Sequence, residues 1–327
     1  MQVSLKYTVM DVISVANASD EMSPPWRLDP INQASLPLDG YYSSLYTGIG
    51  VHIYLIDTGV QTNHPEFLNA AGTASRVVAG GWSYDGTNNT EDCNRHGTAT
   101  ASLAGGGSVG TGPNATLHAV RAVSCGGTAQ TADLISALNY VALNAEMPTI
   151  VSMSVGAGTL ITPLELAVNN TVDLQDVITS ISSAAFIIKF ICKHIPLAKP
   201  LPCDVRLFNI SVIVAAGNSS EDACSTSPPL SAYVAAVGAT VVTYQIADYS
   251  NTIKCVNVYA PGSDIYCANI DSGYQKISGT SIACPIVTGV MGPYFQYNNS
   301  LTTYDITDTI YRSRTRGNVL TGLPEDL

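Results

Sequence analysis

The sequence predicts an α/β protein of three layers, in which a mainly parallel central sheet is covered by helices on both faces. Apolar runs rich in β-branched residues, such as 50–57 and 211–216, are typical of parallel strands buried on both faces. These runs alternate along the chain with helical segments, as parallel sheets require. The 327 residues are 46% hydrophobic and only 12% charged, which fits a compact globular protein. This length is enough for one large domain or two smaller ones.

The first expected strand, 50–57, stops at a Thr-Gly pair and places Asp57 at its carboxyl end. Open α/β sheets bind their ligands at that edge. An Asp before Thr-Gly is also a common turn or helix-capping residue, so the position alone leaves both interpretations open. Further strands are expected at 117–123, 149–155, 211–216 and within 232–243, and helices at 99–104, 131–145, 163–172 and 282–290.

The stretch Gly-Thr-Ser-Ile-Ala-Cys-Pro at 279–285 precedes an apolar, small-residue run that is typical of a buried helix. Ser281 is therefore expected at a helix N-terminus, where backbone N–H groups have no intrahelical partner. Those groups can stabilise negative charge on a carbonyl oxygen under attack, so Ser281 is a candidate nucleophile. An ordinary helix cap is the alternative interpretation.

Serine-dependent acyl transfer needs a hydroxyl, an imidazole that takes its proton, a carboxylate that orients the imidazole, and a donor beside the oxyanion. The ends of expected strands and loops supply this set as Ser281, His96, Asp57 and Asn218. The remaining histidines are expected to be structural or exposed: His52, His64, His118 and His194.

Four short blocks carry these residues: Leu-Ile-Asp-Thr-Gly-Val at 55–60, His-Gly-Thr at 96–98, Ala-Ala-Gly-Asn at 215–218, and 279–285. In sequence and in the order Asp, His, Ser, the chain resembles the subtilisin-like serine proteases, peptidase family S8. Pro-Trp-Arg-Leu at 25–28, Asp-Cys-Asn at 92–94 and Ala-Pro-Gly at 260–262 are similar to the proteinase K-like branch. The resemblance implies the three-layer subtilisin-like fold and a serine endopeptidase that hydrolyses peptide bonds with broad specificity through an acyl-enzyme.

The resemblance also implies the roles of individual residues. Asp57, His96 and Ser281 would form the catalytic triad, and Asn218 would donate to the oxyanion. Substrate backbone would pair as an added β-strand, a mode in which main-chain hydrogen bonds supply the affinity. The implied substrate-binding residues are Gly127, Thr128, Ala129, Ser154, Val155, Gly156, Ala216 and Gly217.

No cofactor or metal is expected for the chemistry. The family commonly binds structural calcium, but Asn257 stands where the proteinase K-like branch uses a carboxylate, which weakens that expectation here. The implied disulfides are Cys93 with Cys125 and Cys224 with Cys255, each worth about 3 to 4 kcal/mol in the chain-entropy model. Cys284 is expected to be a buried thiol, and the pairing of the others is left open: Cys192, Cys203 and Cys267.

The net charge of −11, from 14 basic and 25 acidic residues, argues against nucleic acid or an anionic membrane as the main partner. No apolar run reaches the length of a membrane span. The expected partners are protein or peptide substrates and a propeptide inhibitor, and the expected state is a monomer. Cysteines and several Asn-x-Ser/Thr triplets favour a secreted protein. Residues 1–20 lack a signal-peptide core, so either export follows another route or the chain begins downstream of its true start.

Three departures from the family pattern affect these expectations. Ala99 replaces a usual histidine and Ile282 a usual methionine, and both are expected to be packing variants. About 30 extra residues, at 174–209, interrupt the approach to the strand at 211–216. They are either a surface insertion or an error in the gene structure, and displacing that strand would separate Asn218 from Ser281.

We therefore expect a propeptide remnant or disordered N-terminus at 1–22, and one peptidase domain at 23–327. The alternative function is a catalytically impaired homologue that binds peptides in the same groove. An α/β-hydrolase esterase is disfavoured, because the serine lies in Gly-Thr-Ser-Ile-Ala and not in Gly-x-Ser-x-Gly.

Overall fold

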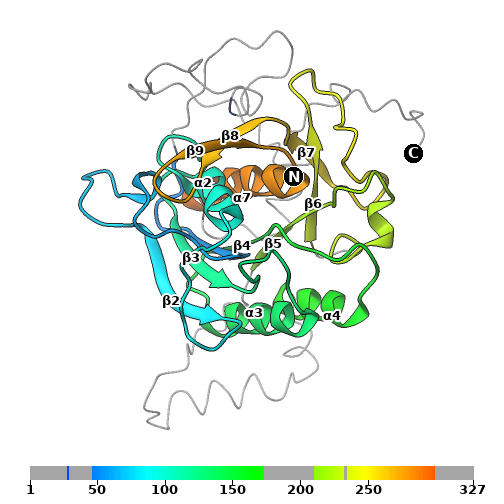
Figure 1. Ribbon diagram of the computed structural model, residues 1–327, viewed down its shortest axis with the longest axis horizontal. Coiled ribbons are helices and arrows are strands. Elements are labelled where there is room, and N and C mark those ends of the chain that lie inside the picture. Colours follow the sequence, from blue (N-terminus) through cyan, green and yellow to red (C-terminus); the bar gives the residue numbers. More distant parts are fainter. Residues whose placement is uncertain (1–27, 29–45, 173–209, 232–233, 299–327) are drawn as a thin grey trace, which may run out of the picture.

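The computed structural model describes residues 28, 46–172, 210–231 and 234–298. Its centre is a seven-stranded parallel sheet in the order β2-β3-β1-β4-β5-β6-β7 (Figure 1). The predicted class, with a parallel central sheet, is confirmed. The strands are β1 His52–Asp57, β2 Val77–Ser83, β3 Thr116–Arg121, β4 Thr149–Met153, β5 Ser211–Ala215, β6 Val234–Thr240 and β7 Val258–Pro261.

Helices cover both faces of this sheet. The helices α2 (His96–Gly105) and α7 (Thr280–Tyr297) pack on one face, and α3 (Thr131–Asn144) and α4 (Thr162–Val172) on the other (Figure 1). Two short 3₁₀ helices, η1 (Pro65–Phe67) and η2 (Ala223–Ser225), and an antiparallel hairpin of β8 (Ile265–Ala268) and β9 (Tyr274–Ile277) complete the described elements. The hairpin lies against α2, on the same side of the sheet as α7.

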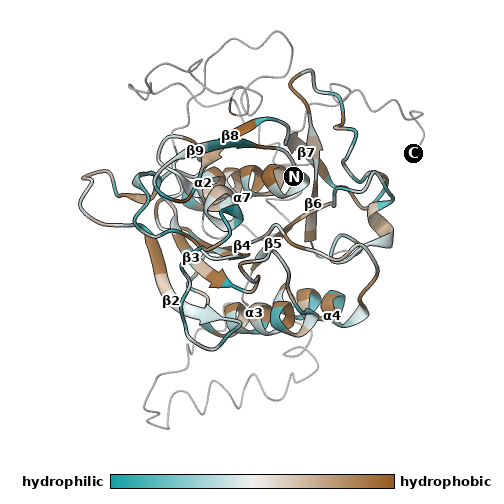
Figure 2. Ribbon diagram, viewed as in Figure 1, coloured by the Kyte–Doolittle hydropathy of each residue, from teal (hydrophilic) through white to brown (hydrophobic). Residues whose placement is uncertain are grey.

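Side-chain alternation in β1 explains why both faces need a cover. Ile53 and Leu55 pack into the core beneath α2 and α7, whereas Tyr54 and Ile56 pack into the core beneath α3 and α4. Figure 2 shows hydrophobic stretches in the strands and mixed colours along α3, which has one buried and one exposed side. Two apolar cores therefore hold β1 at the centre of the molecule.

The direction in which strands are added to the sheet reverses at β1, and the candidate site lies at this point. The chain runs from β1 to β2 and β3 on one side, and then crosses to β4 on the other side of β1. Parallel sheets leave a crevice where the order reverses, at the carboxyl ends of the strands. Asp57 is the last residue of β1 and lies at that point.

Most expected elements agree with the structure to within a few residues. The helix at α2 begins at His96, three residues earlier than predicted, and α7 continues to Tyr297 through two internal prolines. The strand β5 pairs with β4 and β6, so the extra residues before it do not displace it. The expected insertion at 174–209 and N-terminal segment at 1–22 lie outside the described residues.

The sequence analysis missed β2, β7 and the β8–β9 hairpin. The glycines at 80 and 81 interrupt the apolar pattern of β2, which is a half-exposed edge strand with a register shift between Val78 and Trp82. At the opposite edge, β7 has only four residues and ends in Pro261, a residue tolerated at sheet edges. Edge strands bury too little of their surface to show a clear pattern. Within the described residues, no helix is long and apolar enough to cross a membrane.

Candidate active site

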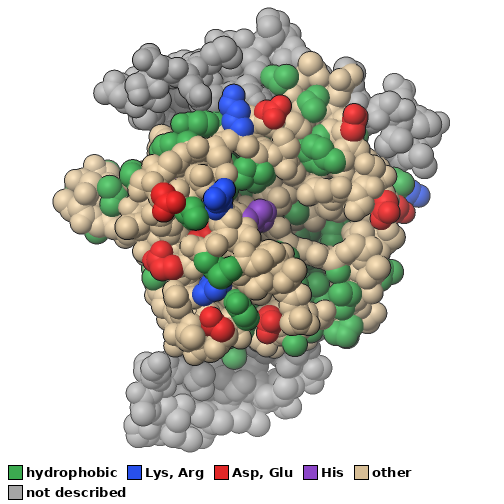
Figure 3. All heavy atoms as spheres, in the orientation of Figure 1, with side chains coloured by type: hydrophobic (Ala, Val, Ile, Leu, Met, Phe, Trp, Pro, Cys, Tyr) green, Lys and Arg blue, Asp and Glu red, His purple; other side chains and the backbone are tan. Residues whose placement is uncertain are grey.

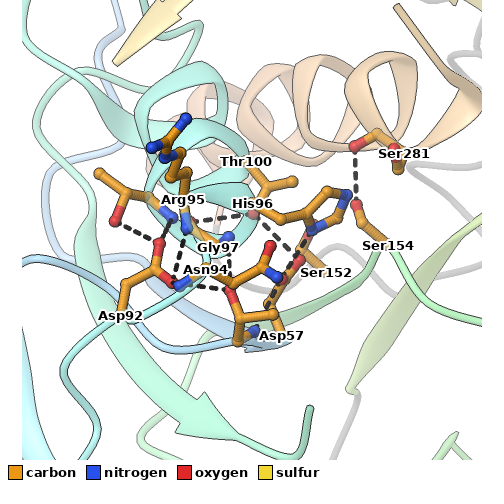
Figure 4. A network of polar contacts seen from close by, with 12 residues as sticks. Asp57, Asp92, Asn94, Arg95, His96, Gly97, Thr100, Ser152, Ser154 and Ser281 are labelled. Atoms are coloured by element: carbon orange, nitrogen blue, oxygen red, sulfur yellow. Dashed lines mark hydrogen bonds and ion pairs between the residues drawn. The ribbon is translucent and has the colours of Figure 1, made fainter. Parts of the chain in front are cut away.

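The carboxylate of Asp57 holds the imidazole of His96. The distance from His96 Nδ1 to Asp57 Oδ1 is 2.7 Å, and Asp57 is only 2% exposed (Figure 4). Asp57 also accepts hydrogen bonds from the Thr58 backbone N–H at 2.7 Å and from Thr100 Oγ1 at 3.2 Å. Because an ionised carboxylate can only accept, Nδ1 of His96 carries the proton in this bond, and Nε2 keeps its lone pair.

The pKa of His96 is raised above its usual value. The negative charge of Asp57 is the main cause, burial opposes it, and the hydrogen bond to Asp57 and the charge of Asp92 add to the increase. The side chain of His96 is 30% exposed. The site therefore stabilises the imidazolium ion while leaving one ring nitrogen accessible to a reactant.

Asp92 organises the start of α2, a role that the sequence analysis did not assign to it. Its Oδ1 accepts from the backbone N–H of Asn94 at 2.8 Å and from Thr58 Oγ1 at 2.9 Å. Its Oδ2 accepts from the backbone N–H and the hydroxyl of Thr98, at 2.8 and 2.6 Å. Asp92 thus joins the helix start to the loop after β1 (Figure 4). A carboxylate just before a helix is a capping signal that could have indicated this role.

A close backbone approach holds the first turn of α2 against the loop that follows Asp57. A Cβ on Gly97 would lie 2.0 Å from the carbonyl oxygen of Gly59. Since no larger residue fits there, glycine lets the first turn of α2 touch the loop that follows Asp57. The position of His96 relative to Asp57 depends on this contact.

Ser281 is the second residue of α7 and is half-buried. Its backbone carbonyl would normally accept from the residue four positions later, but that residue is Pro285, which has no N–H. The hydroxyl of Ser154 takes the vacant place and donates to the Ser281 carbonyl at 2.9 Å. This bond links the start of α7 to the segment after β4 (Figure 4).

The side chain of Asn218 lies beside Ser281. Its Oδ1 accepts from the Thr280 backbone N–H at 2.8 Å and from Thr280 Oγ1 at 2.9 Å. A backbone N–H can only donate, so the amide oxygen faces Thr280 and Nδ2 is directed away from it. A Cβ on Gly279 would lie 3.0 Å from Ser281 Oγ and 3.4 Å from Asn218 Nδ2. Glycine therefore leaves open the space between the hydroxyl and the amide donor.

The structure brings the four predicted residues to one edge of the sheet. In Figure 4 the ring of His96 projects from the start of α2 toward the start of α7, where Ser281 lies. Among the described residues, His96 and Ser281 are not joined by a hydrogen bond. Figure 3 shows acidic and basic side chains scattered over this face, with a histidine exposed near its centre.

The predicted substrate-binding residues fall into two groups. The segments 127–129 and 154–156 belong to no β-strand in the described structure, and Thr128 and Gly156 are exposed. In the first group, Gly127 N–H donates to the Ser124 carbonyl at 2.9 Å and the Thr128 carbonyl accepts from Ser124 N–H at 2.8 Å. Both backbone groups of Ala216 and both of Gly217 also have partners inside the protein. Ala216 N–H donates to Val237 at 3.0 Å, and Gly217 N–H donates to Thr280 Oγ1 at 3.1 Å. Their carbonyls accept from the side chain and the backbone of Asn251.

The remaining predictions concern residues around the site. The disulfides Cys93–Cys125 and Cys224–Cys255 are both present, as predicted. Cys284 is a buried thiol, and burial raises its pKa to about 11. Cys192 and Cys203 lie outside the described residues.

The two substitutions at family positions are packing variants, as expected. Ala99 and Ile282 are fully buried in the same apolar cluster, between α2, α7 and the β8–β9 hairpin. Neither side chain therefore faces a reactant. Asn257, named above in connection with calcium, accepts from the Ala236 backbone N–H at 2.7 Å and so joins β6 to the segment before β7.

A parallel sheet of this order, with Asp57, His96, Asn218 and Ser281 at its reversal point, defines the class of subtilisin-like proteins. The chain belongs to the subtilase family, whose profile, Peptidase_S8, matches residues 48–324. A crystal structure of a cold adapted subtilisin-like serine proteinase matches with a TM-score of 0.77 and 35% identity, over 92% of this chain and 94% of that one.

Curated relatives agree with this family. Alkaline serine exoprotease A of Vibrio alginolyticus is 36% identical over 95% of this chain and 50% of its own length. The extracellular serine proteinase of a Thermus species is 33% identical over 83% of this chain and 57% of its own. Proteinase R of Parengyodontium album is 28% identical over 88% and 64%. The chain thus spans about half the length of the first two relatives. The predicted resemblance to proteinase K-like proteases is confirmed.

Proposed function

We propose that the protein is a serine endopeptidase that cleaves peptide bonds through an acyl-enzyme on Ser281. The observation that carries the proposal is the 2.7 Å bond between His96 Nδ1 and the buried carboxylate of Asp57. This bond fixes the tautomer in which Nε2 is the proton acceptor, as a general base for a serine requires. The membership of the chain in the subtilase family supports the same reaction.

The reaction would proceed in two halves. In the first half, Nε2 of His96 takes the proton of Ser281 Oγ while Oγ attacks the carbonyl carbon of the peptide bond. The amide of Asn218 and the N–H groups at the start of α7 would donate to the oxyanion. His96 then gives its proton to the leaving amine. In the second half, water repeats the attack on the acyl-enzyme and releases the acid.

Substrate backbone would pair with the segments 127–129 and 154–156, which lie outside the β-strands of the described structure. Backbone pairing does not distinguish side chains, so broad specificity follows. Ala216 and Gly217, whose backbone groups are bonded within the protein, would contribute contact surface beside Asn218 and not strand pairing.

A further proposal concerns where the protein acts. The two disulfides favour an oxidising compartment, and the relative from Thermus carries the name extracellular, so we infer a secreted enzyme. Structural calcium, a propeptide inhibitor and a monomeric state stay predictions from the family resemblance.

A fluorophosphonate probe tests the proposal, because it forms a covalent bond only with an activated serine. We expect labelling of the full chain and none of Ser281→Ala, together with cleavage of a casein substrate by the full chain alone. Asp57→Asn serves as the matched control, since it keeps the shape of the side chain and removes its charge. Absence of labelling from a folded parent chain would favour the peptide-binding, catalytically impaired alternative.

A further inference from the structure

Three metal-ligating side chains meet at the end of the sheet opposite the active site. His52 is the first residue of β1, His118 lies on the adjacent strand β3, and Glu146 follows α3. The distance from His52 Nδ1 to His118 Nε2 is 2.9 Å, and the three ligand atoms all lie within 4.8 Å of one another. Asp57 lies at the other end of β1, about 16 Å away at the usual rise of a strand.

Neighbouring groups hold these side chains in place. The ring of Tyr54 stacks on the ring of His118, with centroids 4.1 Å apart and planes inclined by 7°, and His118 is only 7% exposed. The Tyr54 hydroxyl donates to the Asn144 carbonyl at 3.3 Å and accepts from the Glu146 backbone N–H at 3.2 Å. The hydroxyl of Thr149 donates to the Glu146 carbonyl. One tyrosine therefore orients an imidazole ligand and also fixes the backbone of the carboxylate ligand.

The spacing fits a metal ion with little rearrangement. Ligands bound tetrahedrally to Zn²⁺ at about 2.1 Å lie about 3.4 Å from one another, so the two imidazole nitrogens need to separate by only about half an ångström. The carboxylate oxygen of Glu146 lies within 4.8 Å of both nitrogens, and this exposed side chain can turn toward the ion. The two facing ring nitrogens lie at hydrogen-bond distance, so without a metal one of them carries a proton and the other accepts it. A bound ion would take the place of that proton, which would then be carried by the far nitrogen of its ring. Glu146 is exposed and His52 is half-buried, so an ion reaches the cluster from solvent and can keep a water ligand.

We propose that His52, His118 and Glu146 form a binding site for a divalent transition-metal ion, with Zn²⁺ as the best fit to two imidazoles, one carboxylate and a water. Imidazole and carboxylate ligands in this number suit Zn²⁺ and Co²⁺ better than Ca²⁺, which prefers six or more oxygen ligands. The ion would join β1, β3 and the segment after α3, and so stabilise the fold far from Ser281.

Metal titration of the full chain tests this site without any reference to peptidase activity. All variants carry Ser281→Ala to prevent self-digestion and are first treated with a chelator. Zn²⁺ binding is measured by calorimetry, and Co²⁺ binding by its visible absorption. We expect one equivalent of either ion, with intense Co²⁺ bands typical of tetrahedral coordination, in the Ser281→Ala parent. The same result is expected in a His96→Gln control, which alters the active site beside the other end of β1.

The ligand variants should bind more weakly. We expect His118→Gln to lose at least about a hundredfold in affinity and Glu146→Gln about tenfold, with loss of the Co²⁺ bands in the former. Glu146 is exposed, so Glu146→Gln keeps the test valid if circular dichroism shows that His118→Gln does not fold. Unchanged affinity in Glu146→Gln, or the absence of saturable binding by the parent below about 100 µM metal, would overturn the proposal.

Discussion

At the carboxyl end of β1, the imidazole of His96 lies beside a buried carboxylate; at the amino end, the imidazoles of His52 and His118 lie beside each other. The negative charge of Asp57 raises the pKa of His96. Burial lowers the pKa of His52, and burial together with the charge of His52 lowers that of His118 to about 4. The two ends of this strand thus have imidazoles beside them in opposite electrostatic environments. The first environment suits a base that must accept a proton, and the second suits a neutral metal ligand.

The two ends also differ in how they are built. The last residue of β1, the loops after β4 and β5, and the first residues of α2 and α7 supply the active site. Hydrogen bonds that Asp92 accepts and that Ser154 and Thr280 donate hold these segments together. The histidine cluster instead lies at the start of β1 and on β3, and a stacked tyrosine from β1 supports it. The two sites are therefore expected to respond to mutation independently, because additivity holds for distant sites without shared partners.

The largest effect should come from Ser281→Ala. We expect kcat for peptide hydrolysis to fall about 10⁶-fold, a magnitude measured for the triad serine of subtilisin itself. Zn²⁺ affinity at the other end of β1 should stay unchanged. Steady-state hydrolysis of a peptide amide and metal titration check the two halves of this prediction. Activity within tenfold of the parent would show that another nucleophile acts.

The next largest effect should come from Asp57→Asn. We expect kcat to fall about 10⁴-fold, as for the equivalent change in a serine protease triad, because the wrong tautomer of His96 is then favoured. The pKa of His96 should also fall, since the charge that raises it is gone. Kinetics and an NMR titration of the imidazole measure both changes. A His96 pKa that does not move would contradict the role given to Asp57.

Removing the amide donor of Asn218 should have a smaller effect. Asn218→Asp keeps the oxygen that accepts from Thr280 but replaces the donor at Nδ2, so the local structure should persist. We expect kcat to fall about 10² to 10³-fold with little change in KM, a range established on subtilisin's own oxyanion asparagine. Asn218→Ala, which loses both functions, is the control. A change in KM alone would assign Asn218 to substrate binding.

The smallest effect, on stability, should have opposite signs at the two ends of β1. The raised pKa of His96 means that its contribution to stability is fully present below pH 6.5 and is lost as pH rises through its folded pKa. The lowered pKa of His118 means that the unfolded state binds more protons between pH 6.5 and about 4, so stability falls as pH falls through that window.

Urea unfolding at several pH values, with chelator present, measures these slopes in the Ser281→Ala background. We expect His118→Gln to reduce the loss of stability between pH 6.5 and 4, and His96→Gln to leave that loss unchanged. The same loss in both variants would mean that carboxylates, and not His118, dominate this part of the profile.

The sequence by itself determined the fold class, the order of most elements and the four residues at the active edge. Burial on both faces makes β1, β4 and β5 nearly continuous apolar runs, so their positions and their carboxyl ends can be recognised locally. The family resemblance supplied the disulfides and the identities of Asp57, His96, Asn218 and Ser281. Each of the four blocks that carry the site residues lies within a few consecutive residues.

Only the tertiary structure decided which distant groups meet. His52 and His118 are 66 residues apart and touch because β3 pairs with β1 in a register that places His118 opposite Tyr54. Ser154 reaches the Ser281 carbonyl across 127 residues, at a place that Pro285 leaves vacant. Local patterns report how deeply a residue is buried, whereas strand order and register decide which residues become neighbours, and these arise from packing the whole chain at once.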